Sequence, residues 1–424
     1  MPFLKRKQRR LTMIEDRVAY QCAEPVPARA ESVPILSFFT GLGLLDLGFH
    51  NAGFESAWHN EFSSDFVRGF TYGMESLGIS GTASAIQNSQ SVVDVGPNQI
   101  LRDAFGSAGK PNLMGIIGGP PCPDFSVGGK NQGHEGDRGR LSQTYVSRIL
   151  EIRPAFFLFE NVPGLLRTAK HRTFLKQLLE QLAPYYRLDL RVVNALEYGV
   201  PQDRERLILV GLCNKWLRRH DRRVDKRQSP ELLMEHARGS LIGESQLDLL
   251  AHWMPWDRFR THPDAKAKYN WPETSPFGAT PSRPGGLPEA IIVGPLICDL
   301  ERTALLANGT EGFTPYSKRF KTVAEGDVSK KCFKRLHRWR FSPAAAYGNN
   351  EVHLHPTEPR RLTVREAMQI QTVPEKFALP PEMTLSSKFK TIGNAVPVRL
   401  AEAMARSLKE VIDAVINGKS YANV

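Results

Sequence analysis

From residue 34 to residue 213 the chain repeats one pattern, in which a short apolar run is followed by a polar or glycine-rich turn and then by a helical stretch. The helical stretches include Leu141–Ile152 and Phe174–Leu182. The apolar runs are Ile35–Phe38, Phe54–Trp58, Leu113–Ile117, Ala155–Phe159, Tyr186–Val193 and Leu207–Leu212. Strands that alternate with helices form a mostly parallel sheet that is covered by helices on both faces. The pattern therefore predicts an α/β fold with a doubly wound, Rossmann-like domain.

This pattern stops near Asn214. Residues 214–358 are rich in Pro, Gly and basic residues and show no clear period, and helical patterns return at Thr363–Ile370 and Arg399–Ile416. We therefore expect a main domain that is interrupted by an insertion and completed by the C-terminal helix. The predicted parts are a basic N-terminal arm at 1–30, a main domain at 31–213 plus 385–424, and a smaller inserted domain at 214–384.

Positive charge is concentrated in two segments of the chain. The formal net charge is +12 and the isoelectric point is about 9.5. Lys and Arg exceed Asp and Glu by 4 in residues 1–30 and by 8 in residues 214–340, whereas residues 31–213 carry a net −2 and residues 341–424 a net +2. Segregated positive charge is typical of proteins that bind a polyanion, so we expect a nucleic-acid partner.

The cysteines and the hydropathy pattern exclude several classes of protein. The five cysteines form no CxxC pair, which argues against a disulfide framework or a structural zinc site and for a reducing, cytoplasmic location. The basic N-terminus lacks the apolar core of a signal peptide. No apolar run approaches the roughly 20 residues of a membrane helix. We therefore expect a cytoplasmic protein without a membrane anchor and without a bound metal.

A glycine-rich turn follows the first apolar run. Small residues at Gly41 and Gly43, next to Phe39, let the backbone approach a ligand at the carboxyl end of a parallel strand. Glu61 closely follows the second run, where an acidic residue commonly bonds the ribose hydroxyls of a nucleoside. The chain has no GxxxxGK[ST] loop for a triphosphate. These residues favour an adenosine-type cofactor without a phosphate chain.

A proline-rich loop follows the third apolar run and contains Cys122. Pro120, Pro121 and Pro123 fix the backbone of this loop and remove N–H donors from it. A rigid loop that presents one thiol at the ligand edge of a sheet suits a nucleophile. Taken alone, the loop fits a small buried cysteine equally well.

Charged residues follow or precede two further strands. Glu160 comes directly after a buried apolar run, where it is placed for acid–base chemistry, although it could also cap a helix. Arg204 and Arg206 precede the last run and are expected on the same side of an extended segment. They could bind phosphate or orient Glu160, or they could form a surface cluster of ion pairs.

Together these blocks resemble the DNA (cytosine-5) methyltransferases, typically bacterial enzymes of restriction–modification systems or solitary ones. The resemblance covers residues 34–213 and 358–410, with the motifs in the order and spacing of that family. The matching stretches are FFTGLGLLDLGF, GGPPCPDFS, FENVPG, QDRERLILVG, RRLTVREAMQIQTVPEKF and FKTIGNAVPVRL. Six ordered motifs make the resemblance specific.

The resemblance implies that a methyl group passes from S-adenosylmethionine to C5 of a flipped-out cytosine in a specific double-stranded DNA sequence. It places Cys122 as the nucleophile that bonds C6, Glu160 at cytosine N3, and Arg204 and Arg206 in the catalytic site. Residues 214–384 become the target-recognition domain. The implied S-adenosylmethionine contacts are Phe39, Gly41, Gly43, Glu61, Val92, Gly119, Pro120, Leu141 and Asn394. A monomer that acts separately from a cognate restriction endonuclease is also implied.

The chain departs from the family pattern at Leu44, which replaces a glycine, at Pro123, which replaces a glutamine, and at Ser91, which replaces an aspartate near the adenine. The alternative function is a transfer-RNA cytosine-5 methyltransferase of the same fold, against which the long basic insertion argues. An inactive DNA-binding relative is a third possibility, although Cys122, Glu160 and Arg206 are intact. The predicted DNA contacts in the insertion are Lys331, Phe333, Lys334, Arg335, Arg338, Trp339, Arg340 and Phe341.

Overall fold

The computed structural model describes residues 32–121, 137–220, 228–239, 252–330, 332–345, 347 and 353–419. The predicted nucleophile Cys122, the N-terminal arm at 1–30 and Lys331 lie outside the described residues. The helices are α2 (Leu44–Asn51), α3 (Ser64–Ser76), α4 (Pro97–Phe105), α5 (Asp137–Ile152), α6 (Gly164–Arg167), α7 (Ala169–Leu182), α8 (Asn214–His220), α9 (Pro230–Ala237), α11 (Ala265–Lys268), α12 (Gly294–Ile297), α13 (Leu300–Leu305), α14 (Val364–Ile370), α15 (Leu385–Asn394) and α16 (Val398–Ile416).

The strands of the main sheet confirm the predicted alternation. They are β1 (Val33–Phe38), β2 (Phe54–Asn60), β3 (Gly115–Gly118), β4 (Phe156–Asn161), β5 (Tyr186–Asn194) and β7 (Glu205–Cys213). The remaining short strands are β6 (Gln202–Asp203), β8 (Lys334–Arg335), β9 (Ser342–Pro343) and β10 (His353–Leu354). Each of the six apolar runs that the sequence pattern marked became a strand of one sheet.

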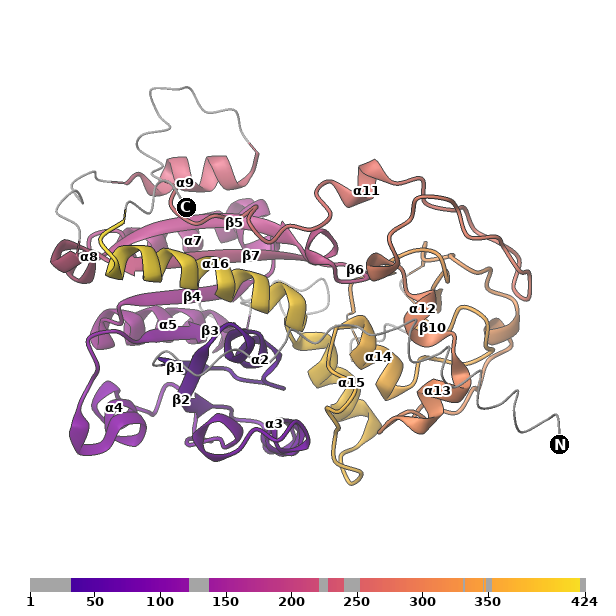
Figure 1. Ribbon diagram of the computed structural model, residues 1–424, viewed down its shortest axis with the longest axis horizontal. Coiled ribbons are helices and arrows are strands. Elements are labelled where there is room, and N and C mark those ends of the chain that lie inside the picture. Colours follow the sequence, from indigo (N-terminus) through magenta and orange to yellow (C-terminus); the bar gives the residue numbers. More distant parts are fainter. Residues whose placement is uncertain are drawn as a thin grey trace. The chain divides into compact units, whose positions relative to one another are not determined.

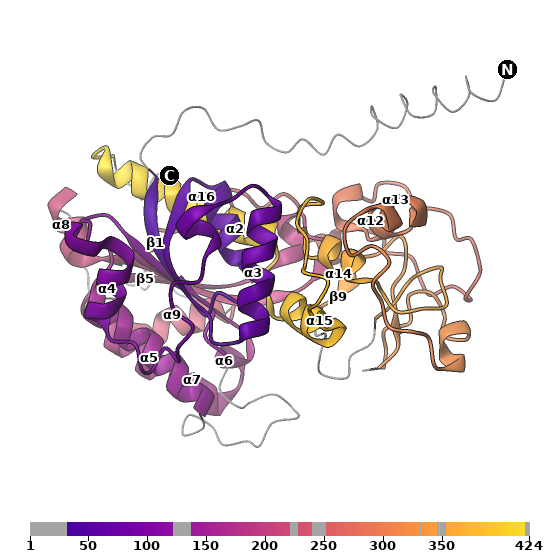
Figure 2. The same cartoon turned by 90° about the horizontal axis from the view of Figure 1, so that it is seen from below.

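The sheet has the order β2-β1-β3-β4-β7-β5. The first four strands in this order run parallel to one another, and β7 is antiparallel to both β4 and β5. Helices α2 and α16 cover one face, and α5 and α7 cover the other (Figure 1, Figure 2). This doubly wound, Rossmann-like arrangement is the one that the sequence predicts, because both faces of a mostly parallel sheet must be buried.

Helix α2 packs closely on α16 because α2 carries a glycine at the contact. A Cβ atom added at Gly48 would lie 2.4 Å from the Cβ of Ala401 and 2.5 Å from the backbone nitrogen of Glu402. The C-terminal helix thereby returns to the first helix of the sheet domain, as the sequence pattern indicated.

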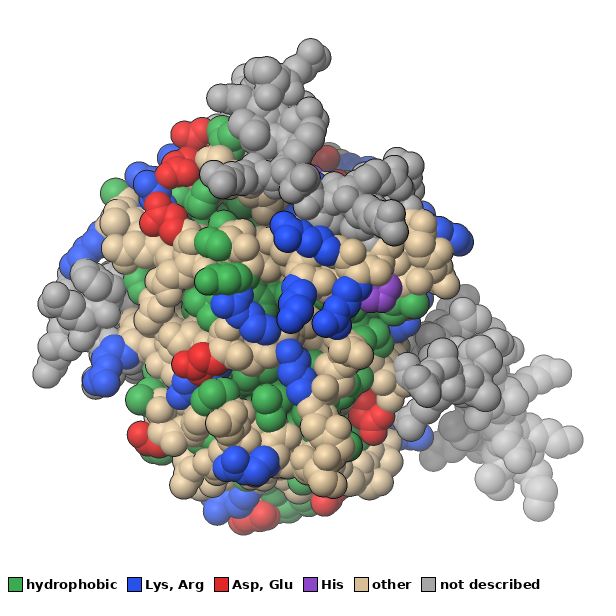
Figure 3. Space-filling model, turned by 90° about the vertical axis from the view of Figure 1, so that its left-hand side faces the viewer, with side chains coloured by type: hydrophobic (Ala, Val, Ile, Leu, Met, Phe, Trp, Pro, Cys, Tyr) green, Lys and Arg blue, Asp and Glu red, His purple; other side chains and the backbone are tan. Residues whose placement is uncertain are grey.

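Two large hydrophobic cores organise the described chain. The first surrounds the sheet and includes residues that follow Asn214, namely Trp216 and Leu217 of α8, Leu233 of α9, and Trp256. The second joins α2 and α3 to α12, α14 and α15. The predicted domain division at 213/214 and 384/385 stays a prediction, but the packing places α8 and α9 on the sheet, on the side of the molecule that Figure 3 shows.

None of the helices in these described ranges combines the length and apolar character that a bilayer span requires.

Candidate functional site

The turn after β1 has an unusual backbone that brings it close to the end of β2. Phe39, Gly41 and Gly43 all have positive φ, at 55°, 58° and 74°. The backbone N–H of Thr40 donates to the carbonyl of Asn60 over 3.0 Å. A Cβ at Gly43 would lie 2.4 Å from the Phe70 ring, so glycine is required there for both conformation and space. The turn therefore presents backbone, rather than side chains, at the carboxyl edge of the sheet.

Glu61 joins this turn to the segment after β2. Its Oε2 accepts the N–H of Gly41 over 2.9 Å, and its Oε1 accepts the N–H of Ser63 over 2.8 Å. Burial raises the pKa of the Glu61 carboxyl, while the N–H groups of Ser63, Gly41 and Phe62 lower it. Each carboxylate oxygen has capacity for a further donor. Glu61 can therefore both fix the turn and receive the hydroxyls of a bound ligand.

Phe62, which the sequence analysis did not single out, follows Glu61 and is 73% exposed. Its ring offers a flat apolar surface on which a planar ligand group can stack, beside the buried acid. The signal in the sequence was an aromatic residue directly after the acid. A lone exposed aromatic is common enough that this signal is weak without a structure.

The segment at residues 88–92 is held at the carboxyl edge of the sheet by Asn60. Its Nδ2 donates to both oxygens of Asn88 and to the carbonyl of Gln90, over 2.9–3.1 Å. The neighbouring Val92 is 2% exposed and belongs to the first core. A contact between Val92 and a cofactor would therefore come from its backbone rather than from its side chain.

The loop after β3 lies against the end of β4. Asn161 Nδ2 donates to the carbonyl of Pro120 over 3.2 Å, and the N–H of Val162 donates to Asn161 Oδ1 over 2.9 Å. A Cβ at Gly119 would lie 2.6 Å from Oε2 of Glu160. Glycine at 119 thus lets the Glu160 carboxylate lie beside the loop that leads into Cys122.

Glu160 forms a largely buried ion pair with Arg206. Nε of Arg206 lies 2.7 Å from Oε1 of Glu160, and their side chains are 13% and 11% exposed. Burial lowers the pKa of the Arg206 guanidinium, while the Glu160 carboxylate raises it. Arg206 comes from β7, which pairs with β4, so the sheet itself brings the two side chains together.

Arg204 is located differently from Arg206, although the sequence analysis grouped them. Its side chain is buried and donates to the carbonyls of Ala345 (2.9 Å), Gly393 (2.8 Å) and Ala395 (2.9 Å). Burial lowers the pKa of its guanidinium. These bonds engage both terminal nitrogens, so Arg204 joins the segments at 345 and 393–395, and its predicted place in the catalytic site stays a prediction.

The two remaining predicted cofactor contacts lie on different helices. Leu141 of α5 is half-buried against the first core, and Asn394, the last residue of α15, is exposed. The ring of Tyr145, one turn along α5 from Leu141, makes an edge contact with Phe39 at 6.1 Å between centroids. Helix α5 therefore borders the β1 turn.

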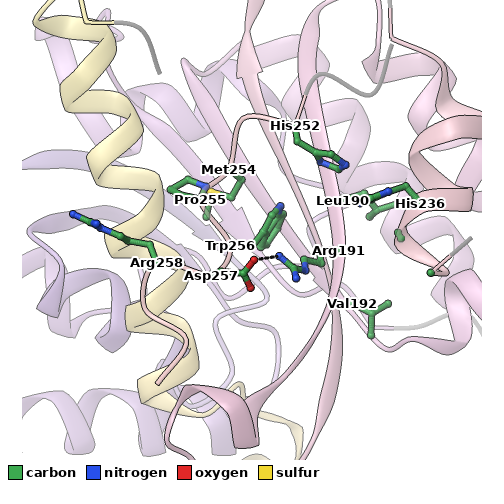
Figure 4. A pocket seen from close by; sticks show the side chains of 12 residues that line it. Leu190, Arg191, Val192, His236, His252, Met254, Pro255, Trp256, Asp257 and Arg258 are labelled. Carbon is green, nitrogen blue, oxygen red and sulfur yellow. Dashed lines mark hydrogen bonds and ion pairs between the residues drawn. The ribbon is translucent and has the colours of Figure 1, made fainter. Parts of the chain in front are cut away.

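A cavity at β5 lies away from these residues (Figure 4). It has a volume of about 830 Å³ and is lined by β5, by α9 and its C-terminal end, and by residues 252–258. Asp189 of β5 is buried and accepts from His252, one of the lining residues, over 2.8 Å. None of the predicted site residues lines this cavity. Gly239 and His252, which flank residues outside the described ranges, both line it, so we assign it no function.

In the inserted segment, the structure contradicts one predicted DNA contact. Arg335 is fully buried and donates to the backbone carbonyls of Phe320, Val323, His355 and Glu358. The prediction that Arg335 contacts phosphates is therefore wrong. Arg338 is also engaged, because its Nη2 lies 2.8 Å from Oε2 of the buried Glu325. No cluster of three or more metal-binding side chains occurs among the residues that the structure describes.

A family model described as "C-5 cytosine-specific DNA methylase" matches residues 33–410 of the chain. A Type II methyltransferase from Neisseria meningitidis serogroup C, M.NmeDI, is 41% identical over 386 residues, which are 89% of this chain and 84% of that protein. The Type II methyltransferase M.XorII from Xanthomonas oryzae is 31% identical over 395 residues, with the same shares covered.

Solved structures share the fold. A structure described as a DNA modification methyltransferase encoded within an E. coli prophage gives a TM-score of 0.58 at 23% identity and covers 90% of this chain and 100% of that one. The Dnmt2 methyltransferase of S. pombe gives a TM-score of 0.54 at 11% identity, over 90% of this chain and 99% of that one. At these identities the likeness supports the fold alone.

Proposed function

The chain belongs to the family of C-5 cytosine-specific DNA methylases, and from that membership we propose how its residues carry out the methyl transfer. It is a DNA cytosine-5 methyltransferase. The proposed reaction takes the methyl group from S-adenosylmethionine to C5 of a flipped-out cytosine, through a covalent bond between Cys122 and C6. The transfer-RNA alternative loses support, because the 41% and 31% identical relatives are both named Type II methyltransferases.

One observation carries this proposal. Glu160, which is ion-paired to Arg206, lies beside Gly119, and the neighbouring Asn161 donates to the carbonyl of Pro120, in the loop that continues into Cys122. A carboxyl held beside the start of the loop that continues into Cys122 suits a heterocycle that needs a proton donor on one nitrogen and a nucleophile on a nearby carbon.

Cytosine C5 is a poor nucleophile until the ring is activated. We propose that the Cys122 thiolate forms a bond to C6 while the Glu160 carboxyl, in its protonated form, donates its proton to N3, which directs electron density to C5, and that N3 returns this proton to Glu160 when the C6–sulfur bond breaks. S-adenosylmethionine supplies the methyl group as an electrophilic carbon when it is bound. Loss of the C5 proton to a base then lets the C6–sulfur bond break, which returns Cys122 as a thiolate. Arg206 keeps Glu160 oriented through these steps.

The carboxyl edge of the sheet fits the nucleoside part of this cofactor. Glu61 is placed to accept ribose hydroxyls, and the exposed Phe62 ring next to it can stack on adenine. The glycine turn at Phe39, Gly41 and Gly43 leaves room for a ligand beside its backbone. This fit supports S-adenosylmethionine as the methyl donor.

Chemistry on C5 and C6 of a stacked base requires the base to leave the helix. We propose that the target cytosine is flipped out of double-stranded DNA and that the inserted segment reads the surrounding sequence. The Type II names of the relatives favour the modification half of a restriction–modification system. The proposed enzyme is a monomer that works on cytoplasmic DNA, with any cognate endonuclease acting separately.

A covalent trap tests this mechanism. Bisulfite sequencing of DNA from expressing cells first identifies the methylated sequence. A duplex with 5-fluorocytosine at that position should then form an adduct with the enzyme that survives denaturation, because fluorine cannot leave as the C5 proton does. Cys122→Ser should abolish both the adduct and turnover.

Cys298→Ser serves as the matched control, because burial raises the pKa of the Cys298 thiol to about 12 and makes it unreactive. The control should keep both the adduct and turnover. Undiminished methylation by Cys122→Ser would refute the proposed nucleophile.

A further inference from the structure

Part of the positive charge that the sequence pattern assigned to the insertion lies on the sheet domain. Helix α8 comes directly after β7, and its apolar residues Trp216 and Leu217 are 5% and 0% exposed in the first core. Lys215, Arg218 and Arg219 of the same helix are exposed. The buried apolar side fixes α8 on the sheet, so these three cations face outward from the sheet domain.

Two neighbouring turns add cations beside α8. Arg219 Nη1 donates to Asn112 Oδ1 over 3.2 Å, which joins α8 to the turn that carries Lys110. Lys110 Nζ donates to the carbonyls of Ile152 (2.6 Å) and Arg153 (2.5 Å). The Arg153 guanidinium lies 3.3 Å from the centre of the Tyr185 ring. We call Lys110, Arg153, Lys215, Arg218 and Arg219 the basic surface.

The basic surface has no acidic counterpart among the described residues. None of its five cations forms an ion pair with an Asp or Glu there, whereas nearby Arg148 pairs with Glu151. Figure 3 shows Lys and Arg side chains gathered across the middle of this face, with few acidic ones between them. Burial lowers the pKa of Lys110, and the cations Lys215, Arg153 and Arg219 lower it further, against an opposing effect of Cys213. Cations held this close repel one another, so an anionic ligand would stabilise them.

The basic surface lies at the opposite end of the sheet from the methyl-transfer site. Strand β7 has Arg206 near one end, beside Glu160, and Cys213 at the other, directly before α8. At about 3.3 Å per residue, these seven steps span about 23 Å. A duplex held at the site would have to bend sharply to reach α8, and duplex DNA is stiff over about 150 base pairs.

We propose that the basic surface binds the backbone phosphates of a second segment of duplex DNA while the first segment occupies the methyl-transfer site. DNA is the polyanion that the enzyme's own reaction brings to it. Exposed Lys and Arg side chains without acidic partners supply phosphate contacts that do not depend on base sequence. The enzyme can then hold two DNA segments and pass between them without entering free solution.

A capture experiment tests this proposal with the full chain. The enzyme is loaded on an immobilised short duplex that contains its target, and a labelled duplex without the target is then added. The parent enzyme should retain the labelled duplex in a salt-dependent manner. The triple variant Lys215→Gln, Arg218→Gln, Arg219→Gln should retain at least about tenfold less labelled duplex than the parent. The slope of its log affinity against log salt concentration should be shallower by about 2 to 3, because each lost phosphate contact removes about 0.9 from that slope.

The matched control removes the same charge from scattered exposed sites, as Arg102→Gln, Arg238→Gln, Lys376→Gln. The control should capture the second duplex as the parent does. Both variants should methylate the short duplex within about twofold of the parent rate, which also shows that they fold. Equal loss of capture in the two triple variants would mean that net charge alone acts. Unchanged capture in the α8 variant, or no capture by the parent, would overturn the proposal.

Discussion

Nε of Arg206 lies 2.7 Å from Oε1 of Glu160, and the other carboxylate oxygen of Glu160 faces Gly119, where no side chain intervenes. The ion pair therefore fixes one oxygen and leaves the other directed at the loop that leads into Cys122. A carboxyl oriented in this way has a defined direction for its remaining hydrogen bond, which matters more for proton chemistry than its charge alone.

Glu160→Gln tests this orientation. The amide has nearly the same shape, so the variant should fold and bind S-adenosylmethionine as the parent does. Methyl transfer should fall by roughly 10²–10⁴-fold, the usual scale for a lost acid–base group. Single-turnover kinetics with labelled cofactor measure it. A rate within about twofold of the parent would show that N3 is activated by another group.

Glu61 should make cofactor binding and stability depend on pH in opposite directions. Burial raises the pKa of Glu61, so between the usual pKa of a Glu and the raised value the folded protein binds more protons than the unfolded chain. The free energy of unfolding should therefore fall as the pH rises through that window. Affinity for S-adenosylmethionine should rise over the same window, because ribose hydroxyls donate best to the carboxylate.

Calorimetric titration and urea unfolding at several pH values measure both slopes. Glu61→Gln should flatten both of them, and Glu61→Ala should weaken S-adenosylmethionine binding more than DNA binding. Unchanged cofactor affinity in Glu61→Ala would mean that the acid only fixes the turn at Gly41.

Arg204→Met should reduce stability, because it leaves the carbonyls of Ala345, Gly393 and Ala395 without a donor inside the protein. Buried unsatisfied carbonyls cost about 1–3 kcal/mol each, with partial relief by water, so we expect a loss of about 2–4 kcal/mol in the free energy of unfolding. Urea unfolding measures it. The exposed Arg102→Met is the control and should change stability by less than about 0.5 kcal/mol.

Gly48→Ala should separate α2 from α16. The new methyl group would lie within 2.4–2.7 Å of Ala401 and Glu402, including backbone atoms that cannot rotate away. Overpacking of this kind costs about 1–3 kcal/mol. Gly96→Ala is the matched control, because nothing lies within 4 Å of its added Cβ and its φ of −79° suits alanine. Equal thermal midpoints for the two variants would contradict the close approach.

The hydrophobic period of the sequence predicted the strands of the sheet and the positions of Glu61 and Glu160 at its carboxyl edge. It could not predict that β7 runs antiparallel, because an apolar run has the same period in either direction. Arg204 and Arg206 were expected on one side of a strand, but residue 204 falls in the break between β6 and β7, where the alternation of sides does not hold.

The burial of particular cationic side chains also could not be predicted from the sequence. Arg335 lies in a basic stretch that resembles an exposed surface, and the carbonyls that bury it belong to Phe320 and His355, distant along the chain. The positive charge of α8 was counted with the insertion because the sequence pattern does not show which domain this helix packs against. Only the packing of Trp216 shows that the helix belongs to the sheet domain.

The hydrogen bonds of Arg204 also bear on when a chain that is still being synthesised can complete its fold. Glu160 and Arg206 are both synthesised early, but the carbonyl of Ala395 that Arg204 binds comes 191 residues after it. At 5–20 residues per second, translation takes about 10–40 s to cross that distance. Until residue 395 has been synthesised Arg204 lacks this bond, so we expect DNA modification to begin only when synthesis is nearly finished.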